Sequence, residues 1–187
     1  MVSRERVVKV LKAVELYGRQ HPYMWNVSWE NGSLLKTLVL AKGAERVLEV
    51  GTSDGFSTIW LAWAASIVGG RVITVEMDAE RVAMASRNLA EADLADYVEQ
   101  VIGNAKIKLP GLQGEFDFVF LDAAKSEYLS YFDAVRGKLA RGALVVADDA
   151  ITERESMLGY LNAVENDPEL ESALISIDDG IEITYVR

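Results

Sequence analysis

The chain has 187 residues, a length typical of one domain that buries a sizeable core. Lys and Arg number 19 against 29 for Asp and Glu, and the formal charge of −10 argues against nucleic acid and anionic membrane surfaces as partners. The chain has no cysteine, and His21 is its single histidine, so a disulfide framework, a thiolate zinc site, a Cys nucleophile and a multi-histidine metal site are all excluded.

The first 43 residues are predicted to form two helices, about 3–18 and 32–42, the second of which ends at Gly43. We expect them to cover a cofactor and substrate site. The N-terminus shows no signal-peptide pattern, which predicts a cytoplasmic protein. The longest nearly apolar run, residues 56–68, has 13 residues, whereas a membrane span needs roughly 20, so it predicts a buried helix.

Short apolar runs alternate with helical patterns from residue 46 onward, which predicts a mostly parallel sheet. Helices are expected at 55–68, 78–92 and 126–140, and strands at 46–50, 71–76, 97–102, 116–122 and 143–149. Two last strands, 172–177 and 181–187, are separated by the turn "DDG", which favours a hairpin. The sequence therefore predicts an α/β, Rossmann-like, doubly wound seven-stranded sheet with a C-terminal antiparallel hairpin. No linker or repeat divides residues 1–187, which predicts one domain.

Almost every predicted strand ends in an acid or a glycine, at the edge where open α/β sheets bind ligands. Those residues are Glu49, Gly51, Glu76, Gly103, Asn104, Asp122, Asp148 and Asp149. Strand ends also simply carry turns and helix caps. However, Thr152 and Glu155 form a capping-box pattern for the helix after the fifth strand, and Ser126 is placed to cap the helix after the fourth. The three aspartates are then free for another role.

The turn in "RVLEVGTSDGFST", residues 46–58, indicates which ligand the site prefers. It lacks the G-x-G-x-x-G of dinucleotide sites, since Ser53 stands at the second glycine position and the carboxylate of Asp54 follows. The phosphate-binding P-loop and the G-x-S-x-G elbow are also absent. A cofactor with a ribose, no phosphate and a positive centre suits an acidic turn, and S-adenosylmethionine is such a molecule. Glu76 is placed to accept its ribose hydroxyls.

Five segments together resemble a known family. "NVSWENG" (26–32), "VLEVGTSDGFST", "ITVEMD", "FDFVFLDAAKSEY" and "LVVADDA" are similar in order and spacing to class I S-adenosylmethionine-dependent O-methyltransferases of the catechol and caffeoyl-coenzyme A type. The resemblance runs from about Met24 to the end of the chain. It implies transfer of a methyl group to a hydroxyl of a small acceptor, which we expect to be aromatic and catechol-like. A homodimer is one expected assembly.

The resemblance also implies a role for individual residues. The methionine end of the cofactor would lie on Glu49, Gly51, Thr52 and Ser57, the ribose on Glu76, and the sulfonium near Val27. Adenine would lie beside Gly103, Asn104 and Ala105. A divalent metal, expected to be Mg²⁺, would be held by Asp122, Asp148 and Asp149. Lys125 would help to deprotonate the acceptor hydroxyl, and Asp122 would serve catalysis and cofactor binding as well.

Two positions depart from the family pattern. Asn104 stands where an acid is common, but an amide can still bond adenine. Asp149 stands where the family usually has Asn, and three carboxylates around one Mg²⁺ leave the site net negative. A metal-independent methyltransferase for another acceptor is therefore an alternative. A non-catalytic cofactor-binding domain is a second alternative, but it would need neither Lys125 nor the three aspartates.

Aromatic residues precede the cofactor segment. Trp25 and Trp29 could stack on a planar acceptor, or could pack the N-terminal helices on the sheet. His21 is interpreted as a loop residue beside Pro22. Trp60 and Trp63, one turn apart on a predicted helix, are expected in the core.

Overall fold

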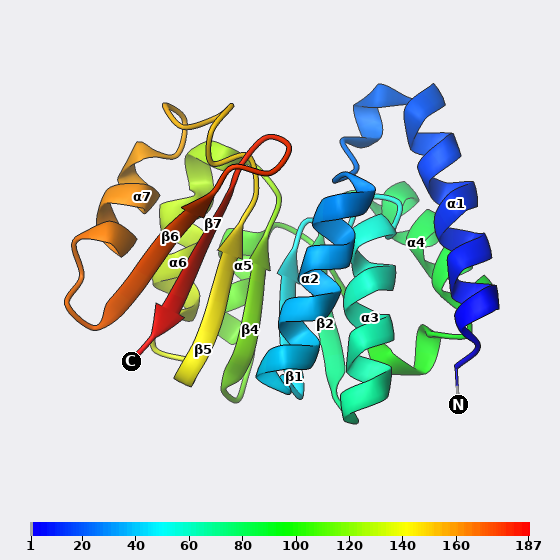
Figure 1. Cartoon of the computed structure of the whole chain (residues 1–187), viewed down its shortest axis with the longest axis horizontal. Helices are drawn as coiled ribbons and strands as arrows, with labels where there is room; N and C mark the ends of the chain where they lie inside the picture. The colour runs from blue at the N-terminus through cyan, green and yellow to red at the C-terminus, as the bar shows by residue number, and fades with distance from the viewer. Residues whose placement is uncertain (1) are drawn as a thin grey trace.

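Seven strands form one sheet in the order β3-β2-β1-β4-β5-β7-β6 in the computed structural model, which describes residues 2–187 (Figure 1). The strands are β1 (Arg46–Val50), β2 (Arg71–Glu76), β3 (Val98–Ile102), β4 (Phe116–Leu121), β5 (Leu139–Ala147), β6 (Leu170–Ile175) and β7 (Ile181–Val186). β1 to β5 are parallel, whereas β7 runs antiparallel to both β5 and β6. The predicted mostly parallel, seven-stranded sheet with a C-terminal antiparallel hairpin is confirmed.

Helices cover both faces of the sheet, and each face has its own hydrophobic core. One core includes buried residues of α1 (Arg4–Gln20), α2 (Trp29–Lys42), α3 (Phe56–Val68) and α4 (Ala79–Glu91). The other includes residues of α6 (Tyr128–Arg136) and α7 (Leu158–Glu165), and the short α5 (Ala105–Lys108) lies on the same side. In β1, Val47 packs into the first core and Leu48 into the second, because successive residues of a strand point to opposite faces of the sheet.

The strand order reverses beside β1, which pairs with β2 on one side and with β4 on the other. In open α/β sheets such a switch point leaves a crevice at the carboxyl ends of the strands, because the loops on either side turn in opposite directions. The loops after β1 and β4 therefore begin next to each other. The fold places the glycine turn beside Asp122 for this reason.

The helices before the sheet differ slightly from their predicted bounds. Serine side chains cap both, since the Oγ of Ser3 accepts a hydrogen bond from the Arg6 amide and that of Ser28 from the Asn31 amide. The second helix, α2, thus begins at Trp29 rather than at residue 32. α3 is buried as predicted, with Trp60 4% and Trp63 7% exposed. Among residues 2–187, no helix has the length and apolar character needed to cross a membrane.

Three local predictions after β4 are wrong. The predicted helix 126–140 ends at Arg136, because β5 already begins at Leu139 and reaches its regular register only after an irregularity in its pairing with β4. Thr152 and Glu155 form no capping box, since residues 150–157 are turns and α7 begins at Leu158. Ser126 lies inside the short 3₁₀ helix η4 (Lys125–Glu127) and caps nothing.

Candidate functional site

A cavity of about 1540 Å³ lies at the carboxyl ends of the parallel strands. Its wall includes the residues after β1, β2, β3, β4 and β5, together with residues 24–30, which precede and begin α2. Of the residues predicted to bind a ligand or to act in catalysis, Val27, Gly51, Thr52, Ser57, Glu76, Gly103, Asn104, Ala105, Asp122, Lys125, Asp148 and Asp149 line it. Glu49 does not.

The backbone around this cavity is strained. Among residues 2–187, five residues other than glycine have a positive φ, and four of them line the cavity: Trp25 (50°), Ser53 (48°), Asp149 (63°) and Asp178 (50°). Such conformations cost free energy and gather at functional sites, where the surrounding structure holds them in place. The strained residues therefore lie in the same region as the carboxyl ends of the strands.

Gly51 is required by the close approach of two strands. Its φ is +102°, and a Cβ atom added there would lie 2.0 Å from the carbonyl oxygen of Asp122. No larger residue fits, because that atom belongs to the backbone of the neighbouring strand end. Gly51 thus brings the glycine turn into contact with the loop that carries Asp122.

Asp54 does not face the cavity, although the sequence interpretation treated it as an acid that would meet the ligand. Its side chain is fully buried, and its Oδ2 accepts a hydrogen bond from the Nδ2 of Asn26 at 3.0 Å. It lines a separate, smaller cavity between α1 and α4 instead. The acidic character of the turn therefore reaches the main cavity through Glu76 and not through Asp54.

Glu76 is the last residue of β2, and its side chain contacts the glycine turn. Its Oε2 accepts from the backbone N–H groups of Thr52 (3.2 Å) and Ser53 (3.0 Å). Its Oε1 accepts from those of Met77 (2.8 Å) and Asp78 (3.0 Å). A carboxylate has about four acceptor positions, so ribose hydroxyls would have to share or replace these contacts.

Glu49 lies beneath the cavity floor with no exposed surface. It accepts hydrogen bonds from the hydroxyls of Ser57 (2.6 Å), Thr58 (2.5 Å) and Thr74 (2.7 Å). Burial raises its pKa from the usual 4.5 to about 7, although the three hydroxyl donors lower it. Ser57 links this carboxyl to the cavity wall directly, and Thr74 links it through the hydroxyl of Thr52 at 2.5 Å.

Replacing Glu49 by Gln should flatten the pH dependence of stability. Because the pKa is higher in the folded than in the unfolded chain, stability is lost as the pH rises from about 4.5 to about 7, by roughly 3 kcal/mol. Glutamine stays neutral and removes that loss. Urea unfolding of both proteins at about pH 5 and about pH 8 measures the difference, and identical pH dependences would show that Glu49 is not titrating.

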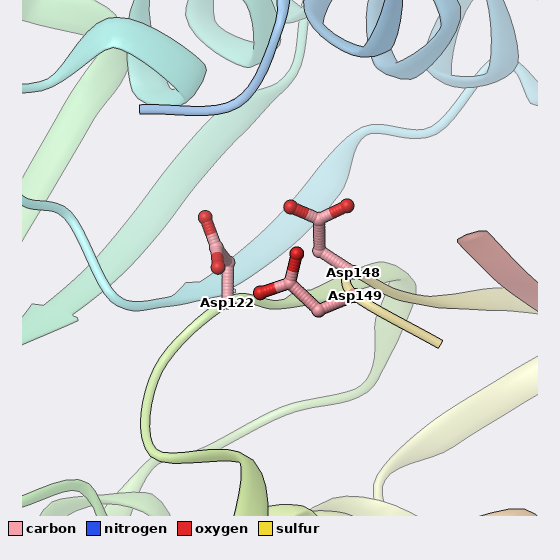
Figure 2. A group of neighbouring side chains, drawn as sticks. All are labelled: Asp122, Asp148 and Asp149. Atoms are coloured by element: carbon pink, nitrogen blue, oxygen red, sulfur yellow. The ribbon is translucent and has the colours of Figure 1, made fainter. Parts of the chain in front are cut away.

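Asp122, Asp148 and Asp149 come from two loops and converge at one point (Figure 2). Asp122 follows β4, and the other two follow β5. One carboxylate oxygen from each lies within 4.8 Å of the others. None of the three side chains caps a helix in the described residues, so the prediction that they are free of capping is correct although its reasoning was not.

A lysine bridges this group. The Nζ of Lys125 is 2.7 Å from the Oδ1 of Asp122 and 2.8 Å from the Oδ2 of Asp149. It also donates to the hydroxyl of Tyr128 at 2.9 Å, and that hydroxyl donates to the carbonyl oxygen of Leu121 at 2.8 Å. Lys125 is therefore fixed on three sides.

These contacts set the charge of the group. Burial alone would lower the pKa of Lys125, but the neighbouring Asp122, Tyr128 and Asp149 outweigh it and raise that pKa, so the side chain is an ammonium at neutral pH. Burial and the two nearby carboxylates raise the pKa of Asp148 to about 8. Burial also raises the pKa of Asp122. Without a metal, a proton on Asp148 therefore relieves part of the like-charge repulsion at neutral pH, and a bound cation would relieve it as well.

The three carboxylates fit a hard divalent cation such as Mg²⁺. Oxygen donors are its preferred ligands, and the three oxygens already lie within 4.8 Å of one another. The Lys125 ammonium supplies only one positive charge among three carboxyl groups. An arrangement of this kind favours a further cation, and Asp122, Asp148 and Asp149 are the residues that would hold it.

The two tryptophans predicted near an acceptor lie in different settings. Trp29 packs edge-on against Trp60, with ring centroids 5.0 Å apart, and also borders the cavity. Trp25 is 75% exposed, and its ring lies 5.6 Å from the guanidinium of Arg81. His21 does not line the cavity and stacks on Tyr17, as expected of a loop residue.

Several residues of this region were missed in the sequence. Asn31, buried in the first turn of α2, donates from Nδ2 to the Oδ1 of Asp148 at 3.3 Å. Asp178 and Asp179 form the tip of the β6–β7 hairpin and line the cavity. The tip is held there because the Asp179 carbonyl accepts from the Ile151 amide at 2.9 Å. The turn "DDG" was recognised, but its contact with the loop after β5 has no local signal.

Comparison with known proteins identifies the family. A family model described as O-methyltransferase matches residues 3–187. A catechol O-methyltransferase of Mycobacterium tuberculosis is 44% identical over 126 residues, which are 67% of this chain and 57% of that protein. A catechol O-methyltransferase of Niastella koreensis is 38% identical over 132 residues, 68% of this chain and 59% of that one. The chain thus spans less than two thirds of these curated relatives.

Solved structures agree with this relationship. The O-methyltransferase TomG of Streptomyces achromogenes, in complex with S-adenosylmethionine, has a TM-score of 0.84 and 30% identity, and the match covers 100% of this chain and 92% of that one. An O-methyltransferase of Bacillus cereus in complex with S-adenosylhomocysteine has a TM-score of 0.81 and 27% identity, covering 98% and 90%. The fold of this chain is that of the Rossmann-like methyltransferases. This chain belongs to the O-methyltransferase family.

Proposed function

We propose that the protein transfers the methyl group of S-adenosylmethionine to a hydroxyl of a small, catechol-like aromatic acceptor, assisted by a divalent cation. The observation that carries the proposal is the meeting of Asp122, Asp148, Asp149 and Lys125 in the same cavity as Glu76 and the glycine turn. The names of the relatives support the choice of acceptor, because two of them are catechol O-methyltransferases.

The charge of the cavity wall supports a cationic cofactor. Eleven acidic residues line it against three basic ones. Each of the three basic residues already lies near an acid: Arg19 is 2.7 Å from Glu15, Arg81 is 4.0 Å from Asp78, and Lys125 is paired as described above. A pyrophosphate would meet repulsion here, whereas the sulfonium of S-adenosylmethionine would not.

In the proposed arrangement the cofactor lies along the strand ends. Val27, Thr52 and Ser57 border its methionine and sulfonium end, while Glu49 acts from beneath the floor by fixing the hydroxyl of Ser57. Glu76 binds the ribose. The adenine lies against Asn104 and Ala105.

Methyl transfer is an in-line displacement that an enzyme promotes mainly by holding the acceptor oxygen against the methyl group. The acceptor hydroxyl must lose its proton for this. A divalent cation bound to the three aspartates would supply positive charge that lowers the pKa of the acceptor hydroxyl. With the cation on the aspartates, Lys125 would no longer be held as an ammonium by Asp122 and Asp149. Its neutral amine would accept the proton of the acceptor hydroxyl, and the ammonium that results would stabilise the oxyanion.

A metal-independent methyltransferase is a second candidate, favoured by one observation. The Lys125 ammonium already joins Asp122 and Asp149 at 2.7 and 2.8 Å. A lysine in this position neutralises part of the charge that a metal would otherwise offset. The effect of a chelator on the reaction rate distinguishes the two candidates.

Cofactor binding tests the proposal. S-adenosylmethionine at a hundred times its dissociation constant should stabilise the protein by roughly 2.7 kcal/mol and raise the melting temperature by about 5–10 °C, whereas NAD should not. Replacing Glu76 by Ala should weaken binding by about 1.5–3 kcal/mol, the value of a charged hydrogen bond. Thermal shift and calorimetry measure both. A response to NAD without one to S-adenosylmethionine would overturn the proposal.

Three further expectations from the sequence belong with this proposal. Residues 1–187 form one methyltransferase domain, in which residues 1–43 cover the cofactor and acceptor. The protein acts in the cytoplasm. It is compatible with a homodimer.

A further inference from the structure

Residues 23–28 lie directly N-terminal to α2 and form the N-terminal segment of the cavity wall. It contributes Met24, Trp25, Asn26, Val27 and Ser28 to the cavity wall. Within residues 2–187, its backbone hydrogen bonds are all local, such as that from the Met24 amide to the His21 carbonyl. No backbone hydrogen bond in that part of the chain joins it to the glycine turn, residues 51–55. Side chains must therefore hold the two walls together.

Two side-chain contacts do so, and a third joins the segment to α4. The Nδ2 of Asn26 donates to the Oδ2 of Asp54 at 3.0 Å, and the Oγ of Ser53 donates to the carbonyl oxygen of Met24 at 2.8 Å. The guanidinium of Arg81, in α4, donates to the carbonyl oxygen of Tyr23 at 2.8 Å. The Oγ of Ser53 also lies 3.8 Å from the Sδ of Met24. The contact between Asn26 and Asp54 joins two side chains, so it depends on the identity of both residues.

Other parts of the chain also contact both members of this pair. The Oδ1 of Asp54 accepts from the Phe56 amide at 3.3 Å, and its carbonyl oxygen accepts from the Nδ2 of Asn88 at 2.8 Å. Asn26 lies against Gly18 of α1, where an added Cβ would stand 2.6 Å from the Asn26 Nδ2. Glycine at position 18 leaves the space that the amide occupies. Neither side chain can turn away without losing a contact.

We propose that Asn26 and Asp54 form a latch that fixes the N-terminal segment against the glycine turn, and that both are positioning residues for the cofactor. The proposal rests on the proposed function. Val27 follows Asn26 directly and lines the cavity, and Thr52 and Ser53 precede Asp54 on the opposite wall. The latch thus sets the width of the site where the sulfonium is expected.

Exchange of the two residues tests the latch. Asn26→Asp places two carboxylates about 3.0 Å apart in a half-buried site, and their repulsion disfavours the closed arrangement. Asp54→Asn keeps an oxygen for the Phe56 amide and an amide group for Asn26, which can rotate to accept from it. The double variant Asn26→Asp/Asp54→Asn restores the pair with the roles exchanged. Asn162→Asp, on the exposed side of α7, changes the charge by the same amount far from the site.

Calorimetry with S-adenosylhomocysteine on folded protein gives the readout. Asn26→Asp should raise the dissociation constant about tenfold, and the double variant and Asp54→Asn should lie within about threefold of the wild type. Asn162→Asp should have no effect. If Asn26→Asp does not fold, Asn26→Ala takes its place and should weaken binding about fivefold. A purely structural pair would change the melting temperature and leave this affinity unchanged.

Two results would overturn the latch: unchanged affinity in Asn26→Asp, or a double variant no better than Asn26→Asp. A wild type that does not bind S-adenosylhomocysteine would instead contradict the proposed function. Hydrogen exchange of residues 23–28 then tests the latch by itself. Faster exchange in Asn26→Asp with recovery in the double variant supports it, and equal exchange in all variants rejects it.

Discussion

Lys125→Met is expected to lower kcat about 10²–10⁴-fold, the range for loss of a group that acts on the transferred proton. Methionine keeps the length of the side chain but removes the charge that lies 2.7 Å from Asp122 and 2.8 Å from Asp149. The acceptor oxyanion then loses its nearest ammonium. The cofactor dissociation constant should not change, because this group acts on the acceptor and not on the sulfonium. Steady-state kinetics and calorimetry separate the two effects.

Lys12→Met is the matched control, since Lys12 is an exposed residue of α1 outside the cavity. Its kcat should equal that of the wild type. Full activity of Lys125→Met across neutral pH would show that the lysine has only a structural role. A melting temperature for each variant shows whether the unpaired aspartates destabilise the fold.

Asp149→Ala should raise the Mg²⁺ concentration needed for half-maximal rate by at least about 10–100-fold, the loss seen when even a supporting residue of a metal site is removed. Asp149→Asn keeps an oxygen ligand and suits the positive φ of 63° at this position. It also removes one negative charge beside the acceptor, which favours deprotonation. Its activity should be retained, and its rate should rise with pH at a lower pH than in the wild type.

Titration of Mg²⁺ at several pH values measures both variants. Asp133→Asn serves as the control, because Asp133 is exposed on α6 and does not line the cavity. If Asp149→Asn, Asp149→Ala and the wild type respond alike to Mg²⁺, position 149 holds no metal. The metal-independent candidate would then be preferred.

Much of the fold could be predicted because its signals are local. Apolar runs such as 46–50 and 71–76 coincide with β1 and β2 at both ends, and the other strands except β5 begin and end within two residues of their predicted bounds. β5 begins earlier, at Leu139, because its pairing with β4 contains an irregularity that no apolar pattern reveals. The prediction of a capping box at Thr152 was wrong because those residues form turns before α7.

The site could be predicted only as far as the strand order determines it. Parallel strands bring Glu76, Asp122 and Asp148 to one edge, and the sequence shows where each strand ends. The direction of a side chain in a turn depends on tertiary partners instead. Asp54 points away from the cavity because Asn26, distant in sequence, supplies its hydrogen-bond donor, and Glu49 lies under the floor among three hydroxyls. No local pattern contains these contacts.

Transfer of a labelled methyl group from S-adenosylmethionine to a catechol hydroxyl tests the central claim most directly. With Mg²⁺ present, the account predicts a labelled methyl ether; chelation should reduce its formation to background, and added Mg²⁺ should restore it. A panel of catechols and hydroxyaromatic acids should be included, because the acceptor loops are not fixed by the strand ends. Absence of labelled product from every acceptor, with cofactor and Mg²⁺ saturating, would contradict the account.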